Sequence, residues 1–403
     1  MAGEQTPFGK GVPAGRGFVA PSADTSKGSI RAAFVSTNSI TQGEQAAAVW
    51  KPLFEMFGIH IDFGYRTFKW GNEAKGKAAV HCVIVGFSAA YSGEKMIFDG
   101  EERIIAKNIN PYLVDAPNVF VESRRKPLFD VPEMQKGSIP VDGGNLIISG
   151  DNYEKFIETE PNAKEYICEF LGSDEFINGV KRFCLWLVGI APAKLRQMPE
   201  VMKRVEACKQ FRLSSQKEAT RKYAEYPTRF MEIRQPDTDF LAIPEVSSEN
   251  RRYIPIGYLS ASTIVSNKIF TVPNATPYHF GILTSHVHMA WMRAVCGRLK
   301  SDYSYSNIIV YNNFPWPDAT DTQKMEIENL AQAVLGARVL YPDSSLADLY
   351  DPLTMPPELL KAHQNLDKTV MKLYGFAKDI TEAAIVAELM GRYEKLVSGS
   401  EEL

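Results

Sequence analysis

Cysteine is scarce in this sequence, and long apolar runs are absent. The five cysteines among 403 residues are scattered and form no C-x-x-C pair, which argues against a disulfide framework or a zinc ribbon and favours reduced thiols. No stretch approaches the ~20 apolar residues that cross a bilayer, and the N-terminus lacks the apolar core of a secretion signal. We therefore expect a cytoplasmic protein with no membrane segment.

Motifs of several enzyme classes are also missing. The sequence contains no G-x-S-x-G elbow, Walker loop or kinase motif set. Gly9-x-Gly11-x-x-Ala14 nominally matches a dinucleotide fingerprint, but no strand precedes it and Pro13 lies where a helix should open. His286 and His288 would share one face of a strand, yet no third ligand of matching spacing lies nearby, so we expect no metal site.

The composition is that of a globular protein with an unusual beginning. With 45% hydrophobic residues and a mass of 45.0 kDa, the chain can form two to three domains. Residues 1–29 are rich in glycine and proline and read as a disordered leader. Apolar patterns then predict strands at 30–36, 59–63 and 78–87 and a helix at 46–57, which together resemble the second half of an α/β sheet ending in a hairpin.

Charge is segregated along the chain. Residues 194–229 hold ten Lys or Arg against four Glu, whereas residues 318–403 hold fifteen acidic and eight basic residues. Helical spacing in the acidic part predicts helices at 322–339, 357–374 and 380–397. The basic part suits a polyanion such as DNA, although a solvated helix face would have the same composition.

Two segments have side chains suited to nucleic-acid bases. Phe68 and Trp70 fall in what reads as a polar loop before the strand at 78–87, where an aromatic ring can stack on an extruded base or simply pack under its own loop. Further along, Arg298, Lys300 and Asp302 share one face if their segment is extended. They would then line a DNA groove, unless they form a salt-bridged surface strand.

Several short motifs, in order, carry a family resemblance. They are VSTNSITQGEQ (35–45), RTFKWGNEA (66–74), NINPYLVD (108–115), PVDGG (140–144), GSDEFING (172–179), PEVSSE (244–249), MAWMRAVCGRLKSD (289–302), YNNFPWP (311–317) and LYDP (349–352). The set resembles the MmeI-like, single-chain type IIL restriction-modification enzymes over about residues 30–375.

The resemblance implies an activity and a domain order. These enzymes transfer a methyl group from S-adenosylmethionine to the N6 amine of adenine in a defined sequence of double-stranded DNA. The resemblance assigns residues 30–126 to the C-terminal part of a Rossmann-like methyltransferase sheet. It assigns 127–317 to an α+β target recognition domain and 318–403 to a small helical domain. Phe68 resembles the aromatic residue that holds the flipped adenine, with Trp70 as second choice.

The candidate DNA contacts combine this resemblance with the charge pattern. They share basic or hydrogen-bonding side chains in the recognition region: Lys203, Arg204, Arg212, Arg251, Arg252, Arg298, Lys300, Asp302, Tyr303, Ser304 and Asn307. Ser304 stands where relatives often have arginine, so the resemblance does not fix the base readout.

The sequence also departs from the family pattern. The glycine-rich cofactor loop and the N-P-P-aromatic motif are missing, so most of the S-adenosylmethionine site is not expected in this chain. We expect it to be inactive alone, as a fragment, a truncated gene product, or one half of a split enzyme whose other chain supplies the cofactor site. The alternative is a DNA-binding specificity module without chemistry of its own.

Overall fold

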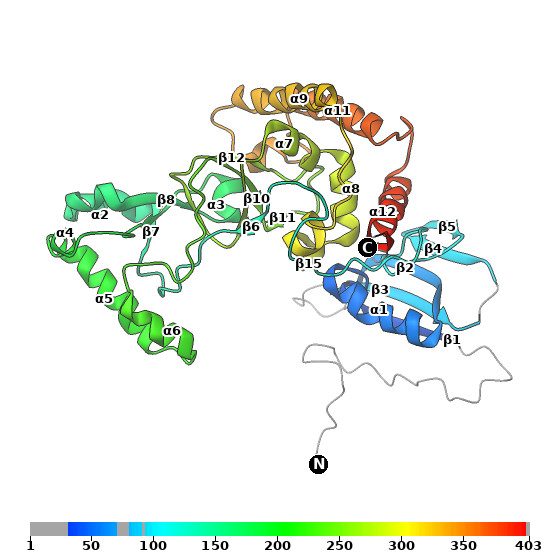
Figure 1. Ribbon diagram of the computed structural model, residues 1–403, viewed down its shortest axis with the longest axis horizontal. Coiled ribbons are helices and arrows are strands. Elements are labelled where there is room, and N and C mark those ends of the chain that lie inside the picture. Colours follow the sequence, from blue (N-terminus) through cyan, green and yellow to red (C-terminus); the bar gives the residue numbers. More distant parts are fainter. Residues whose placement is uncertain (1–30, 71–79, 91–92, 400–403) are drawn as a thin grey trace, which may run out of the picture.

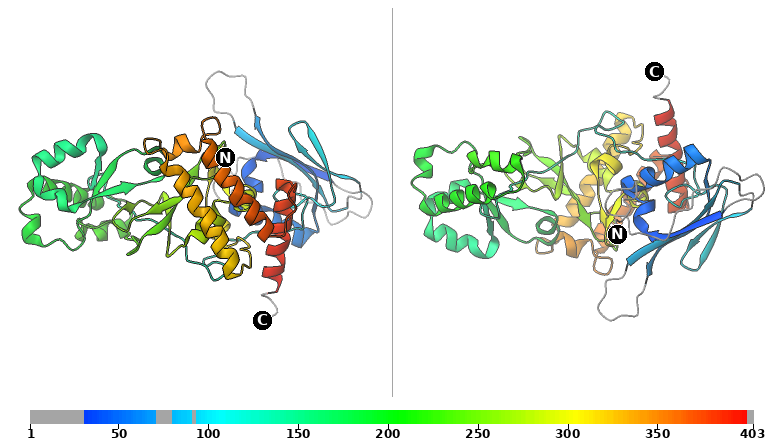
Figure 2. Two further views of the ribbon diagram at one scale, coloured as in Figure 1. Left: turned by 90° about the horizontal axis from the view of Figure 1, so that it is seen from above. Right: turned by 90° about the horizontal axis from the view of Figure 1, so that it is seen from below.

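The computed structural model describes residues 31–70, 80–90 and 93–399, which form three bodies in a row (Figure 1, Figure 2). A mixed sheet lies at one end and a distal lobe, residues 141–234 with the strand at 264–265, at the other. A central body carrying the C-terminal helices joins them. The predicted leader, residues 1–29, lies outside the described residues. Within the described ranges, no helix has both the length and the apolar character needed to cross a membrane.

The mixed sheet follows the predicted order of elements. It contains β1 (Arg31–Thr37), β2 (His60–Trp70), β3 (Val80–Ser88), β4 (Lys95–Asp99) and β5 (Glu102–Ala106), in the order β1-β3-β2-β4-β5. After β1 come η1 (Asn38–Thr41) and α1 (Gly43–Phe57). Trp50 of α1 is fully buried against Val83, Val85 and Phe87 of β3, so the apolar alternation of β3 fixes which sheet face the helix covers.

The expected antiparallel pair of β2 and β3 is present, but β2 extends seven residues beyond its predicted end at residue 63. Phe68 pairs with Cys82 and Trp70 with Val80. The prediction that these two aromatic residues lie in a loop is therefore wrong. The strand continues because its backbone is paired with β3, although its outer residues are too polar to give an apolar strand pattern.

The distal lobe has a core of its own, centred on Leu146, Phe170, Leu185, Val205 and Phe230. Its sheet has the order β13-β8-β9-β7, from β7 (Ile147–Ser149), β8 (Ile167–Leu171), β9 (Arg182–Leu185) and β13 (Ile264–Val265). Its helices are α2 (Gly150–Thr159), η2 (Pro161–Tyr166), α3 (Ser173–Asn178), α4 (Pro192–Leu195), α5 (Pro199–Leu213), α6 (Glu218–Lys222) and η3 (Tyr223–Glu225).

The central body contains two small sheets. One has the order β12-β10-β14-β6, from β6 (Gln135–Lys136), β10 (Phe240–Pro244), β12 (Gly257–Leu259) and β14 (Ile269–Pro273). The other joins β11 (Val246–Ser247), β16 (Asp302–Ser304) and β15 (Gly297–Leu299). Helices α7 (Pro277–Leu283) and α8 (His286–Val295) follow, with a π-helical turn, η4 (Asn307–Tyr311).

His286 and His288 begin α8 instead of sharing a strand, so that prediction is wrong. Ser285 caps this helix by accepting a hydrogen bond from the backbone of His288, a local preference that outweighs the β-like alternation. The buried ring of His288 contacts the Tyr305 hydroxyl through Nε2 at 3.0 Å.

The predicted C-terminal helices are present within two residues of their expected ends. They are α9 (Asp321–Val339), α11 (Pro357–Leu373) and α12 (Glu382–Ser398), with the short α10 (Leu346–Leu349) between the first two. Their apolar faces join the core of the central body, so that Ile327, Leu366 and Leu389 are buried with Trp291 of α8.

Candidate functional site

The segment carrying Arg298, Lys300 and Asp302 is a tight hairpin instead of one extended strand. Arg298 pairs with Tyr303 and Leu299 with Asp302. Lys300 has a φ of 59° and forms the turn with Ser301. The prediction that the three charged residues alternate along one face is therefore wrong, because the chain reverses between the second and the third. Lys300 is instead exposed at the hairpin tip.

Contacts within the protein hold the hairpin's side chains in place. The Arg298 guanidinium lies 4.0 Å from the centroid of the Tyr303 ring and donates to the Ser301 carbonyl at 3.0 Å. The Asp302 carboxylate accepts from the backbone N–H of Glu249 at 3.3 Å. Asn307, beyond the hairpin, donates to the Met134 carbonyl at 3.0 Å, which anchors this region to the chain leading into β6.

Other candidate contacts near the hairpin differ in accessibility. Arg252 is exposed beside the ring of its neighbour Tyr253. Arg251 is half-buried, and burial lowers its pKa although the nearby charge of Asp302 raises it. Ser304 pairs with Val246 of β11. Arg252 and Lys300 are therefore the cations here with most access to a ligand.

Phe68 and Trp70 lie side by side on β2, with ring centroids 6.0 Å apart and planes inclined by 43°. Trp70 is 50% exposed and Phe68 is half-buried. Thr67 and Lys69 alternate with them and occupy the opposite face of the strand. Both rings therefore retain accessible surface on which a flat ligand can stack.

A cavity of about 220 Å³, here called the interdomain cavity, opens on the face of β2 that carries Thr67 and Lys69. Its lining comes from the mixed sheet, the segment after β11 and the hairpin: Asn38, Thr67, Lys69, His81, Glu249, Arg298 and Ser301. A Cβ on Gly43, which has a φ of +53°, would lie 3.4 Å from Gly297, so glycine there lets the start of α1 approach the hairpin. Sequence reasoning missed most of this lining, because no local pattern joins residues so far apart in the chain.

The basic stretch at residues 194–229 contains structural arginines as well as free cations. Arg212 is fully buried and donates to the carbonyls of residues 140, 141, 223, 226 and 229. Arg204 donates to the carbonyls of Asn145 and Ile147, and burial lowers its pKa. Lys203 is exposed and pairs with Glu200 at 2.7 Å. We therefore remove Arg212 from the candidate DNA contacts, because its guanidinium cannot reach a ligand.

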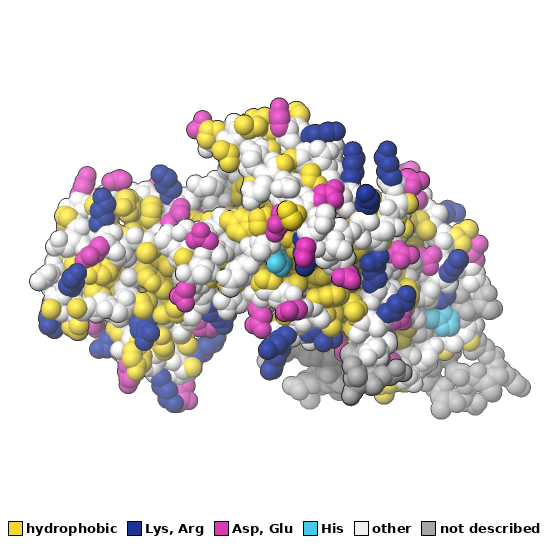
Figure 3. Space-filling model, turned by 45° about the horizontal axis from the view of Figure 1, so that its top comes forward, with side chains coloured by type: hydrophobic (Ala, Val, Ile, Leu, Met, Phe, Trp, Pro, Cys, Tyr) yellow, Lys and Arg dark blue, Asp and Glu magenta, His cyan; other side chains and the backbone are white. Residues whose placement is uncertain are grey.

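The face of the distal lobe in Figure 3 carries both signs of charge. Acidic and basic side chains are interspersed there instead of forming one positive field. Within residues 194–229, the exposed cations whose side chains have no ion pair or hydrogen bond in the described part of the chain are Arg196, Lys209, Lys217 and Arg229. The surplus of basic residues in the sequence thus reaches solvent at only some positions.

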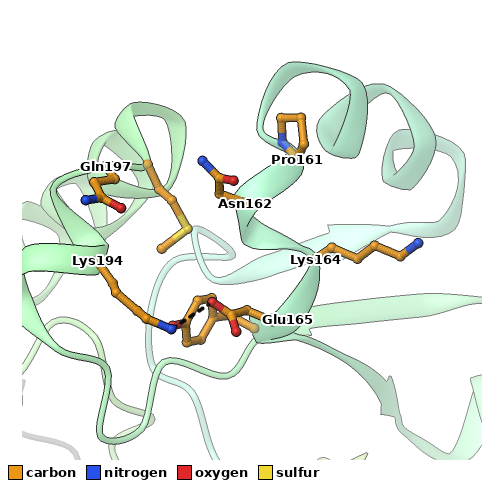
Figure 4. Close-up of a pocket in the computed structure, with 8 residues that line it drawn as sticks. Pro161, Asn162, Lys164, Glu165, Lys194 and Gln197 are labelled. Atoms are coloured by element: carbon orange, nitrogen blue, oxygen red, sulfur yellow. Dashed lines mark hydrogen bonds and ion pairs between the residues drawn. The ribbon is translucent and has the colours of Figure 1, made fainter.

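A second cavity, of about 490 Å³, lies in the distal lobe between η2 and α4 (Figure 4). Lys194 points toward Glu165 and pairs with it at 3.3 Å, whereas Lys164 points away. Hydrogen bonds from Tyr166 and Lys194 hold the pKa of Glu165 below its usual value. The charges of Lys194 and Glu165 therefore compensate each other, and Lys164 adds one positive charge to the lining.

The described residues do not fit S-adenosylmethionine. They include no glycine-rich turn between a strand and a helix, the arrangement that would bring backbone N–H groups to such a cofactor. The interdomain cavity is smaller than the ~300 Å³ of usual cofactor sites, and the larger cavity lies in the distal lobe. No three His, Cys, Asp or Glu side chains within the described ranges are placed to hold a metal.

Family models match the chain in three consecutive parts. They are the MmeI DNA-methyltransferase domain over residues 16–99, the MmeI target recognition domain over 115–318 and the MmeI C-terminal domain over 319–400. The first match begins at residue 16, before residue 30, where the resemblance was expected to start. The match to the target recognition domain alone spans half of the chain.

Individual relatives agree with these models. DNA methyltransferase A of Bacillus subtilis (strain 168) is 43% identical over 358 residues, covering 89% of this chain and 40% of that protein. The solved structure of the type IIL restriction-modification enzyme MmeI in complex with DNA is 49% identical with a TM-score of 0.87, covering 92% of this chain and 50% of that one. The chain thus spans half or less of these relatives. The expected fold class and resemblance are confirmed, and the chain belongs to the MmeI family.

Proposed function

We propose that this chain is part of a site-specific DNA adenine-N6 methyltransferase of a restriction-modification system, acting in the cytoplasm on double-stranded DNA. The observation that carries the proposal is the close structural likeness, over 92% of the chain, to an enzyme solved in complex with DNA. S-adenosylmethionine is the methyl donor that the methyltransferase family implies. In this proposal the described residues bind and orient DNA and capture the target base.

Base capture is assigned to Phe68, with Trp70 as the alternative. A half-buried ring is held in position by its strand and still offers a face to a ligand. Stacking of an extruded base on such a ring contributes about 1–3 kcal/mol and does not depend on the identity of the base. The ring would thus hold the adenine, while specificity comes from other residues.

Sequence readout is assigned to the hairpin of β15 and β16. Its tip presents Lys300, and Asp302 lies one residue beyond the turn. A lysine can donate to guanine O6 and N7, and an aspartate can accept from cytosine N4. A two-stranded ribbon is also narrow enough to enter the major groove. Tyr303 and Asn307 support the hairpin through internal contacts.

Phosphate contacts are assigned to exposed cations. Lys203 and Arg252 remain from the sequence prediction. Arg196, Lys209 and Lys217 join them because these three side chains have no ion pair within the described part of the chain. Each contact releases condensed counterions, so the logarithm of the affinity should fall with the logarithm of the salt concentration by about 0.9 per contact.

A non-catalytic specificity module is the second candidate function. The observation favouring it is that the described residues do not fit S-adenosylmethionine. In this alternative the chain reads DNA, and a separate methylase half supplies the chemistry.

Two measurements on the same protein test these assignments. We expect duplex binding that weakens steeply with salt, and its absence would contradict both candidates. Calorimetry with S-adenosylmethionine tests the cofactor site. Micromolar affinity would show that this chain holds a working S-adenosylmethionine site. That result would exclude the non-catalytic module.

A further inference from the structure

The interdomain cavity is built mainly from hydrogen-bond donors. Six of its seven lining side chains carry an N–H or O–H group, and Glu249 alone is an obligate acceptor when ionised. Lys69 and His81 are a cross-strand pair of β2 and β3, so both project from the same face of the sheet. A ligand that satisfies this cavity must therefore be rich in acceptor atoms.

Two buried nitrogens in the cavity lining have no partner. Nε2 of His81 and Nε of Arg298 are buried and make no hydrogen bond within the described part of the chain. Burying a polar group without a partner is unfavourable, and such groups are uncommon in folded proteins. One nitrogen comes from the mixed sheet and the other from the hairpin, so a ligand with several acceptor atoms that bound both would link the two bodies.

The charge of the cavity narrows the class of ligand. Lys69 and Arg298 are cationic and Glu249 is anionic, which leaves one positive charge in excess when His81 is neutral. One excess charge matches a phosphodiester, which carries a single negative charge. A terminal phosphate carries about −1.5 to −2 at neutral pH and would leave Glu249 facing uncompensated negative charge.

We propose that the interdomain cavity binds one phosphodiester group of the DNA backbone, close to the nucleotide that is captured. This inference rests on the proposed function, because it takes Phe68 as the base-stacking residue. Thr67 and Lys69 flank Phe68 on β2, so a phosphate in the cavity lies across the strand from the ring. The contact would join the mixed sheet to the hairpin when DNA is bound and fix the distance between base capture and sequence readout.

Lys69→Met tests the proposal, because it removes the charge and keeps most of the side chain. Lys69 is exposed, so melting temperature should not change. Duplex binding of the full chain is measured over a range of salt concentrations. The salt slope should fall by about 0.9, so a fourfold rise in salt should weaken the variant about 3.5-fold less than the parent. Lys69→Arg should restore the parental slope.

Lys107→Met is the matched control. Lys107 is an exposed lysine just beyond β5, outside the cavity lining, and its loss changes the net charge equally. If Lys69→Met and Lys107→Met give the same slope, the cavity does not bind a phosphate of DNA and the inference is overturned, while binding by the parent still supports the proposed function. If the parent does not bind duplex DNA, the proposed function fails and this inference fails with it.

Nuclear magnetic resonance of the His81 ring distinguishes a DNA phosphate from a free one. A short duplex should shift the His81 resonances in the parent and shift them much less in Lys69→Met. If inorganic phosphate shifts these resonances and the duplex does not, the cavity is a site for free phosphate and the assignment to DNA is overturned.

Discussion

Arg212→Leu should destabilise the distal lobe without removing a DNA contact. Of the five carbonyls that accept from Arg212, those of Pro140, Tyr223 and Tyr226 also accept from a backbone N–H. Within the described residues, the carbonyls of Val141 and Arg229 depend on the guanidinium alone. A buried polar group left without a partner costs about 1–3 kcal/mol, so two such groups predict a loss of about 2–6 kcal/mol.

Hydrogen exchange of peptides from α5 and α6 measures this loss, because it reports the opening free energy of the lobe separately from the rest of the chain. Arg212→Lys is the informative companion, since it keeps the charge but lacks the planar fork of five donors. We expect it to be destabilised as well. Unchanged exchange in Arg212→Leu together with a salt slope for duplex binding reduced by about one would refute the structural role and restore Arg212 as a phosphate contact.

Three further predictions concern other parts of the molecule. Phe68→Ala in a reconstituted full-length enzyme should lower the rate of methyl transfer, because about 1–3 kcal/mol of stacking is lost, with little change in melting temperature. A large drop in melting temperature would favour a packing role. Binding-site selection on Lys300→Glu and Asp302→Lys should return altered sequences, with about 1–3 kcal/mol of discrimination per contact; an unchanged sequence would place readout elsewhere. Burial lowers the pKa of His288 to about 3, so the unfolded chain binds this proton first as pH falls, and His288 contributes a loss of about 1.4 kcal/mol of stability per pH unit between pH ~6.5 and pH ~3; His363, whose pKa burial also lowers, adds to the fall. His288→Gln should flatten that fall in urea unfolding, and an equally steep fall would exclude His288 as its source.

Local signals predicted the C-terminal helices well. Thr320 and Thr381 accept hydrogen bonds from the backbone N–H groups of Gln323 and Ala384, and Pro357 occupies the first turn of α11. Capping residues and the fixed φ of proline act within one turn of chain. A single sequence therefore carries enough information to place these helix ends.

The errors arose where distant segments decide the structure. Lys300 and Ser301 form a turn without the Gly or Asn that normally marks one, and the hairpin is held by pairing with β11. Phe68 belongs to a strand because of its partner Cys82. The role of Arg212 depends on carbonyls up to 72 residues away. The interdomain cavity likewise joins side chains from residue 38 to residue 301, which no local pattern reveals.

The shared core of the central body has a consequence for the order in which the chain folds as it is synthesised. Asn110, just after the mixed sheet, donates to the sulfur of Met390 in α12, 280 residues later, and Leu389 lies in the same core as Trp291. The distal lobe, whose core draws only on residues up to 264, can close while the ribosome is still translating α9. The central body must wait for α12 to emerge, so its apolar surface stays open until that helix has been made.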